Sequence, residues 1–338
     1  MSKAEPQTRE SELILCHEAN IATLSSIVTG GNIPHAFLFS GQRGIGKSTA
    51  AYHFAKMILS VGRPADNPNE KAPVEAADLF GSPPVSTGNN NSEVIIKYVA
   101  EKVENRNHQD LFIVENKDED RKNIPVEDIR DIGKFLSLTP AEGKYRVAII
   151  DAIDDFSIGA SNAILKILEE PTKNTVIIII CHSKINLLPT IKSRCMELKF
   201  APLSKKDFIL VLSELGYTEE KLEDVYELSS GSPGLALEIL EKKVITLLER
   251  YKSIINSKTV NISEVITLAK EIKEKDAWKV FGELFLSYYS KIIRSKEISK
   301  VSIDSFNKVS DIIYFSEFKN MDIQDSLKYI SYYINQNR

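Results

Sequence analysis

The eight residues GQRGIGKS, from Gly41 to Ser48, constrain the fold more than any other part of the sequence. They follow the apolar run HAFLF and precede TAAYHFAKMIL, whose composition favours a helix. Their spacing fits the pattern G-x-x-x-x-G-K-[ST], in which the glycines allow a tight turn and a close approach of the backbone to a ligand. The segment therefore predicts a strand, a tight loop and a helix in direct succession.

Short apolar runs alternate with helical spacing through the first two hundred residues. The runs that read as strands are HAFLFSG, LFIVE, YRVAIID, TVIIIIC and MELKF. Strands separated by helices indicate a parallel sheet covered on both faces. We therefore predict an α/β P-loop domain with a parallel sheet over residues 1–201. Residues 61–91 are rich in proline and asparagine, and we expect them to form a flexible insert in this domain.

The remainder of the chain is expected to be helical. After Pro233 the sequence contains no proline, and apolar residues recur there at three- and four-residue spacing. We predict a small helical lid domain over residues 202–241 and an all-α C-terminal domain over residues 242–338. The length of 338 residues suits two or three domains of this kind.

Composition excludes several classes of protein. The formal net charge of −4 does not suggest a surface that coats nucleic acid. Cys16, Cys181 and Cys195 are far apart and form no CxxC pair, which argues against a disulfide framework and a zinc cluster. No apolar run approaches the roughly 20 residues that span a bilayer, and the polar start MSKAEPQTRE lacks the apolar core of a secretory signal. We expect a cytoplasmic protein without a membrane partner.

The loop and the strand YRVAIID carry the residue types of a nucleotide site. In this pattern backbone amides and a lysine hold phosphates, while a hydroxyl and an acidic residue at the end of a second strand hold Mg²⁺. The sequence therefore predicts a site for ATP with Mg²⁺. The residues assigned to it are Gly41, Gly44, Gly46, Lys47, Ser48, Thr49 and Asp151.

The residue after Asp151 argues against efficient hydrolysis. An active ATPase of this type is expected to carry glutamate there to activate water, and this chain carries Ala152. Asp154 and Asp155 are close in sequence, but we expect them to cap the following helix rather than to replace the glutamate. We predict binding of ATP with weak or absent hydrolysis.

The span from Glu127 to Ser204 resembles the clamp-loader branch of the AAA+ ATPases. It combines the second-strand aspartate with SNAILKILEEP, another apolar strand and LLPTIKSRC, and GSPGLALE follows in the predicted lid. With PHAFLFSGQRGIGKS the resemblance covers roughly residues 30–240. Within the family the chain is most similar to the delta-prime subunits of bacterial DNA polymerase III, because it has GSPG and lacks the catalytic glutamate.

This resemblance implies further site assignments. Arg194 of the SRC motif matches the arginine finger that reaches the ATP of a neighbouring subunit, and we expect it to act in trans. Pro233 and Gly234 stand where motor subunits carry a lid arginine. His182 stands where a small polar sensor is expected, and we favour a packing role for it. Residues 61–110 lack the four cysteines that bind zinc in many relatives, so no metal site is predicted.

The resemblance implies a stator subunit of the DNA polymerase III clamp loader in DNA replication. Its partners are then gamma/tau ATPase subunits and delta in a hetero-pentameric ring, with the C-terminal helices forming a collar. The ring places the sliding clamp on primer-template DNA. The chain has no polymerase site of its own, so nucleotidyltransferase activity belongs to the holoenzyme. The alternative is an ATP-hydrolysing AAA+ motor of a clamp loader or a related DNA-remodelling ATPase, which the complete loop supports.

Overall fold

The computed structural model describes residues 17–61, 90–116, 123–182, 187–257, 259–295, 300–318 and 322–336. Most of the predicted insert, residues 62–89, lies outside the described residues. The chain divides into two compact units, Met1–Tyr217 and Thr218–Arg338, and each is considered by itself. The three domains predicted from the sequence, with their boundaries, stay a prediction.

The first unit contains a five-stranded sheet in which all neighbouring strands are parallel. The strands are β1 (Ala36–Ser40), β2 (Leu111–Glu115), β3 (Arg146–Asp151), β4 (Thr175–Cys181) and β5 (Met196–Lys199). Their order across the sheet is β2-β3-β4-β1-β5. Each strand lies within one of the five apolar runs of the sequence, so the predicted α/β fold with a parallel sheet is confirmed.

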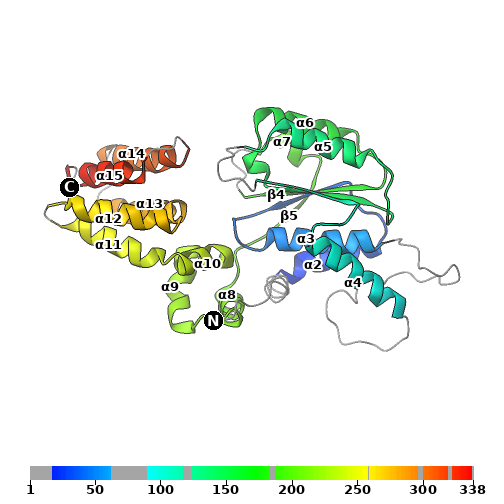
Figure 1. Ribbon diagram of the computed structural model, residues 1–338, viewed down its shortest axis with the longest axis horizontal. Helices are drawn as coiled ribbons and strands as arrows, with labels where there is room; N and C mark the ends of the chain where they lie inside the picture. Colours follow the sequence, from blue (N-terminus) through cyan, green and yellow to red (C-terminus); the bar gives the residue numbers. More distant parts are fainter. Residues whose placement is uncertain are drawn as a thin grey trace. The chain divides into compact units, whose positions relative to one another are not determined.

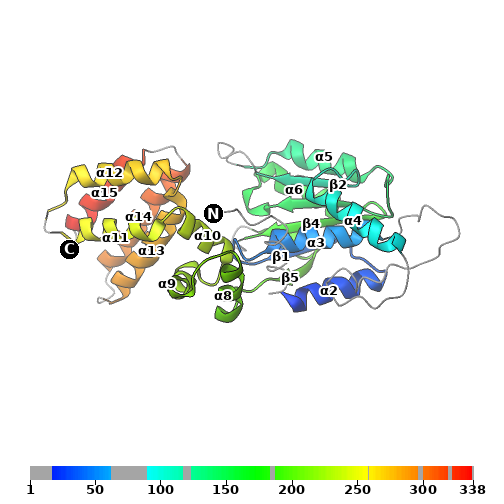
Figure 2. The same ribbon diagram turned by 60° about the horizontal axis from the view of Figure 1, so that its bottom comes forward.

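Helices cover both faces of this sheet (Figures 1 and 2). One face packs against α2 (Glu18–Thr29), α3 (Lys47–Ser60) and α4 (Asn90–Glu104), and the other packs against α5 (Val126–Leu136) and α6 (Ile158–Glu169). On β1, Phe37 and Phe39 join the first core and Leu38 joins the second. Because successive side chains of a strand point to opposite faces, both sets must be apolar, which explains the unbroken apolar runs.

Short elements complete the first unit. They are the 3₁₀ helix η2 (Ile153–Asp155), α7 (Pro189–Lys192) and α8 (Lys205–Glu214). The turn that precedes β3 is fixed by a buried carboxylate, because Asp110 accepts hydrogen bonds from the backbone amides of Ala141 and Glu142, both at 2.7 Å. Arg146 Nη2 lies 3.3 Å from the same carboxylate and is also buried.

In its described residues the second unit contains helices joined by short turns and no strand, as the sequence predicts. Its helices are α9 (Glu219–Ser229), α10 (Pro233–Glu241), α11 (Val244–Asn256), α12 (Ile262–Glu274), α13 (Trp278–Ser295), α14 (Lys300–Phe318) and α15 (Ile323–Gln336). Their shared core centres on aromatic residues, with the Tyr251 ring 5.0 Å from that of Phe285. Trp278 packs in the same core, as expected for a residue at helical spacing.

Candidate nucleotide-binding site

The loop between β1 and α3 has a backbone that requires glycine. A Cβ atom at Gly41 would collide with the backbone carbonyl of Phe200. Gly44 and Gly46 have φ angles of 79° and 96°, a region that side chains with a Cβ rarely adopt. Gly46 is the N-cap of α3, so the loop leads the first amides of the helix towards the space above β1. The loop has the form expected of a phosphate-binding site.

Lys47 is the first residue of α3 and its side chain is only 2% exposed. Its Nζ donates hydrogen bonds to the carbonyls of Gly41, at 2.7 Å, and Gln42, at 2.6 Å. Burial lowers the pKa of the Lys47 ammonium to about 8, and the Asp151 carboxylate only partly opposes this shift. The charged group is therefore held inside the loop by carbonyls that an anionic ligand can replace.

Ser48 and Asp151 meet at the ends of α3 and β3. The Ser48 hydroxyl donates to Asp151 Oδ2 at 2.6 Å, although the two residues are 103 positions apart in the sequence. These are hard oxygen donors of the kind that Mg²⁺ binds, so the pair fits the metal that accompanies a nucleoside triphosphate. Thr49 follows in the first turn of α3 and is partly buried. The structure thus brings together the loop residues and Asp151.

Asp154 does not cap α6, which corrects the expectation from the sequence. The N-cap of α6 is Ser157, whose side chain accepts a hydrogen bond from the Ala160 amide. Asp154 Oδ2 instead accepts the His182 amide at 2.6 Å, and the Cys181 thiol donates to Oδ1 at 3.9 Å. Asp154 therefore stabilises the end of β4, the strand beside β3.

His182 lies inside the site, a placement that the sequence analysis did not favour. Its Nε2 is 3.7 Å from Asp151 Oδ1, and its Nδ1 is buried without a hydrogen-bond partner in the described residues. Burial and then the charge of Lys47 lower the pKa of His182 to about 4, so the imidazole is neutral at pH 7. The adjacency of β3 and β4 was the signal that could have placed it, because parallel strands end at one edge.

Arg194 lies near the ends where the strands begin, whereas the loop follows the end where β1 finishes. It precedes β5 by two residues, and Met196 of β5 pairs with Phe37 near the start of β1. The glycine loop begins only after the last residue of β1. At a rise of about 3.3 Å per residue, Met196 is already roughly 13 Å along the strands from the start of the loop, and Arg194 lies in the turn that precedes it. The structure therefore does not bring Arg194 together with the other predicted site residues.

The side chain of Arg194 is held at the surface by residues of its own chain. Nη1 donates to the Thr190 carbonyl at 2.9 Å and lies 3.4 Å from Ser193 Oγ. Nη2 lies 2.8 Å from Glu169 Oε1, and the two side chains are 34% and 50% exposed. Sequence reasoning missed Glu169, which belongs to the LEEP segment of α6.

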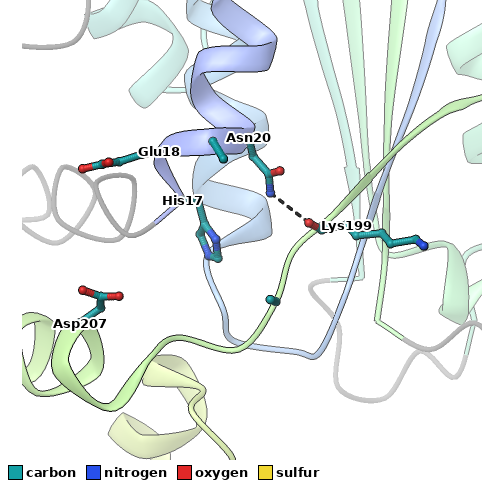
Figure 3. A pocket seen from close by; sticks show the side chains of 7 residues that line it. His17, Glu18, Asn20, Lys199 and Asp207 are labelled. Atoms are coloured by element: carbon teal, nitrogen blue, oxygen red, sulfur yellow. Dashed lines mark hydrogen bonds between the residues drawn. The ribbon is translucent and has the colours of Figure 1, made fainter.

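A separate pocket lies beside the start of α2 (Figure 3). Its volume is about 430 Å³, and its labelled side chains are His17, Glu18, Asn20, Lys199 and Asp207. The buried His17 ring donates from Nε2 to the carbonyl of Ile45 at 2.7 Å, which connects the pocket wall to the glycine loop. Asn20 bonds the Lys199 carbonyl at 3.1 Å. No sequence pattern pointed to these residues.

Pro233 and Gly234, the residues in place of a lid arginine, are the first two residues of α10 in the second unit. In the part of the chain that the structure describes, no group of three histidine, cysteine or acidic side chains is arranged to hold a metal ion. None of the described helices combines the length and apolarity needed to cross a bilayer.

The comparisons with known proteins agree on one family. A family profile described as "DNA polymerase III, delta subunit" matches residues 88–204. DNA polymerase III subunit delta' of Pseudomonas aeruginosa is 32% identical, over 59% of this chain and 53% of the relative. Subunit tau of Bacillus subtilis is 29% identical, over 78% of this chain and 44% of the relative. Subunit delta' of the same organism is 30% identical, over 52% of this chain and 44% of the relative.

The chain thus spans about half the length of these curated relatives. The matched segment, residues 88–204, contains β2 to β5, and the tau match extends over most of the chain. On these grounds the chain is similar to subunits of DNA polymerase III over the part of the sequence that the matches cover.

Proposed function

We propose that this chain is a delta-prime-like stator of the DNA polymerase III clamp loader, acting in DNA replication in the cytoplasm. In this role it joins gamma/tau ATPase subunits and delta in a hetero-pentameric ring, with residues 242–338 in the collar. It helps the ring to load the sliding clamp onto primer-template DNA. The names of the relatives support this assignment at the level of the subunit.

The position of Arg194 is the observation that carries the proposal. An arginine in the turn before β5, where the strand itself begins roughly 13 Å from the phosphate loop, does not reach a nucleotide bound there, yet its guanidinium is partly exposed. A guanidinium supplied by one subunit stabilises the charge that develops on the phosphates held by another. Arg194 therefore acts as an arginine finger in trans, and hydrolysis by the neighbour depends on assembly.

The chain's own site holds ATP in this proposal. The loop amides from Gly44 to Ser48 and the Lys47 ammonium bind the phosphates, while the Ser48 hydroxyl and the Asp151 carboxylate face Mg²⁺. When bound, Mg²⁺ neutralises phosphate charge and orients the chain of phosphates. Ala152 offers no carboxylate to activate water, which supports binding without efficient turnover.

The test uses the reconstituted loader with the clamp and primed DNA. Replacing Arg194 with alanine should lower DNA-stimulated ATP hydrolysis at the neighbouring site that it completes by about 10³-fold, the lower end of what a trans arginine supplies, so the ring loses the share of turnover that this site contributes. Assembly should persist, because the ion pair to Glu169 is partly exposed and contributes little to stability. Lys166→Ala, which removes an exposed charge from α6, is the matched control and should leave turnover unchanged. Full turnover in the Arg194 variant would refute the proposal.

The alternative function is an ATP-hydrolysing AAA+ motor, and the complete loop with the Ser48–Asp151 pair favours it. It predicts Mg²⁺-dependent phosphate release by the isolated chain that disappears in Lys47→Ala. The stator predicts release at the background rate in both proteins. Phosphate release by the two proteins therefore separates these functions without reconstitution.

A further inference from the structure

Glu169 has an unusual position for an acidic residue. It is the last residue of α6, where the carbonyl ends of the helix carry partial negative charge. Glu170 follows directly as the C-cap residue, so two acidic side chains stand at the negative end of one helix. Local helix energetics disfavours both of them. The stability of α6 therefore does not explain the presence of a glutamate at position 169, and contacts outside the helix must explain it.

The contacts of Arg194 supply that reason. Glu169 Oε1 accepts from Nη2 at 2.8 Å, and the Thr190 carbonyl accepts from Nη1 at 2.9 Å. The guanidinium is thus held at both terminal nitrogens, and Nη1 makes a further, longer contact of 3.4 Å with Ser193 Oγ. Each of these nitrogens carries a second hydrogen, which on Nη1 has only the long contact with Ser193 Oγ, and the side chain remains one-third exposed. A second acceptor with the geometry of a phosphate can bind these hydrogens while Glu169 and Thr190 stay in place.

An ion pair of this strength can orient the Arg194 side chain without holding it so tightly that it cannot bind another group. Exposed ion pairs contribute little net stability because water screens the charges and two long side chains lose freedom. The Arg194 side chain has many rotamers. If it is not ordered beforehand, it loses this conformational entropy when it binds the phosphates. Ordering the side chain in advance leaves a smaller cost for the transition state.

We propose that Glu169 is a positioning residue for Arg194, holding its guanidinium in the orientation in which it meets the phosphates bound by the neighbouring subunit. This inference rests on the proposed function of Arg194. It assigns to Glu169 no contact with the nucleotide. Its effect therefore passes entirely through Arg194.

The experiment measures DNA-stimulated ATPase of the reconstituted ring carrying Glu169→Gln. The amide keeps the size of the side chain but removes its charge. We expect kcat at the neighbouring site that Arg194 completes to fall about two- to fivefold, the range of an exposed ion pair, with KM for ATP and the melting temperature of the chain unchanged. Glu170→Gln is the matched control, since Glu170 is exposed and forms no ion pair in the described residues. It should retain the kcat of the wild type.

A double variant separates positioning from other roles. In the Arg194→Ala background, Glu169→Gln should produce no further loss, because the group that it orients is absent. An equal loss in both backgrounds, or Glu169→Gln at wild-type turnover, would overturn the inference while leaving the arginine finger intact. Wild-type turnover in Arg194→Ala alone would instead refute the proposed function, and the positioning role with it.

Discussion

The affinity for nucleotide should fall steeply as pH rises, because Lys47 loses its proton in a pH range where an ordinary lysine keeps it. Burial lowers the pKa of Lys47 from 10.5 to about 8 in the ligand-free chain. Bound phosphates replace the carbonyls of Gly41 and Gln42 as partners of Nζ and raise the pKa again, because an anion favours the charged form. The protonated lysine is therefore the form that binds, and affinity declines as pH rises through the free-chain pKa.

The size of the effect follows from that pKa. At pH 7.5 about three quarters of Lys47 is protonated, and at pH 9.5 only about 3% is. If only the charged form binds, affinity falls about 25-fold between these two pH values. A lysine with the ordinary pKa of 10.5 changes affinity by only about 10% over the same interval. His182, with a pKa of about 4, does not titrate in this range.

The assay is a fluorescence titration of ribose-labelled ADP into the isolated chain in EDTA, so that no metal contributes. The diphosphate is fully ionised above pH 7.5, and its own charge therefore stays constant. Lys47→Arg is the matched control because a guanidinium remains charged at every pH used. Its affinity should be nearly flat, and the wild-type curve should level off near the affinity of Lys47→Ala. A wild-type affinity that changes less than twofold would refute the reasoning.

Three further substitutions test the packing that supports the site. Gly41→Ala should lower the free energy of unfolding by about 1–3 kcal/mol in urea titrations and weaken ADP binding, because its Cβ displaces the Phe200 carbonyl. Asp110→Ala should cost about 3–5 kcal/mol by the same measurement, since it leaves the buried Arg146 charge without its carboxylate, but should not alter ADP affinity in the folded chain. Ser157→Ala removes the N-cap of α6 and should cost about 1 kcal/mol, measured as a shift of the urea midpoint.

The sheet was predictable from the sequence because its strands are buried on both faces. Each run from HAFLF to MELKF had to be apolar at consecutive positions, and this pattern is local. The glycine loop was also local, since the turn and the close approach of Phe200 to Gly41 require glycine itself. The same holds for the helical second unit, where apolar spacing alone indicated helices.

The parts of the site that were missed depend on contacts between distant segments. Asp154 was expected to cap a helix because aspartate near a helix start usually does so. The 3₁₀ turn after β3 instead directs it to the His182 amide, 28 residues further on, and Ser157 takes the capping role. The ion pair of Arg194 with Glu169 likewise joins the turn before β5 to the end of α6, two segments that only the folded chain brings together. Spacing within one segment carries no signal for either contact.

The hydrogen bonds of the carboxylates beside the loop determine whether either of them can activate water for ATP hydrolysis. Asp151 receives the Ser48 hydroxyl, as expected of a group that faces Mg²⁺. Asp154 is the nearest described alternative to the glutamate that Ala152 replaces, but its two oxygens accept the His182 amide and the Cys181 thiol. Taking a proton from water would require Asp154 to give up these bonds and to leave the end of β4 without them. The loop therefore has the groups that bind phosphate. Of the carboxylates beside it, Asp151 accepts from Ser48 and Asp154 stabilises the end of β4. This supports a subunit that binds ATP and leaves ATP hydrolysis to a neighbouring subunit.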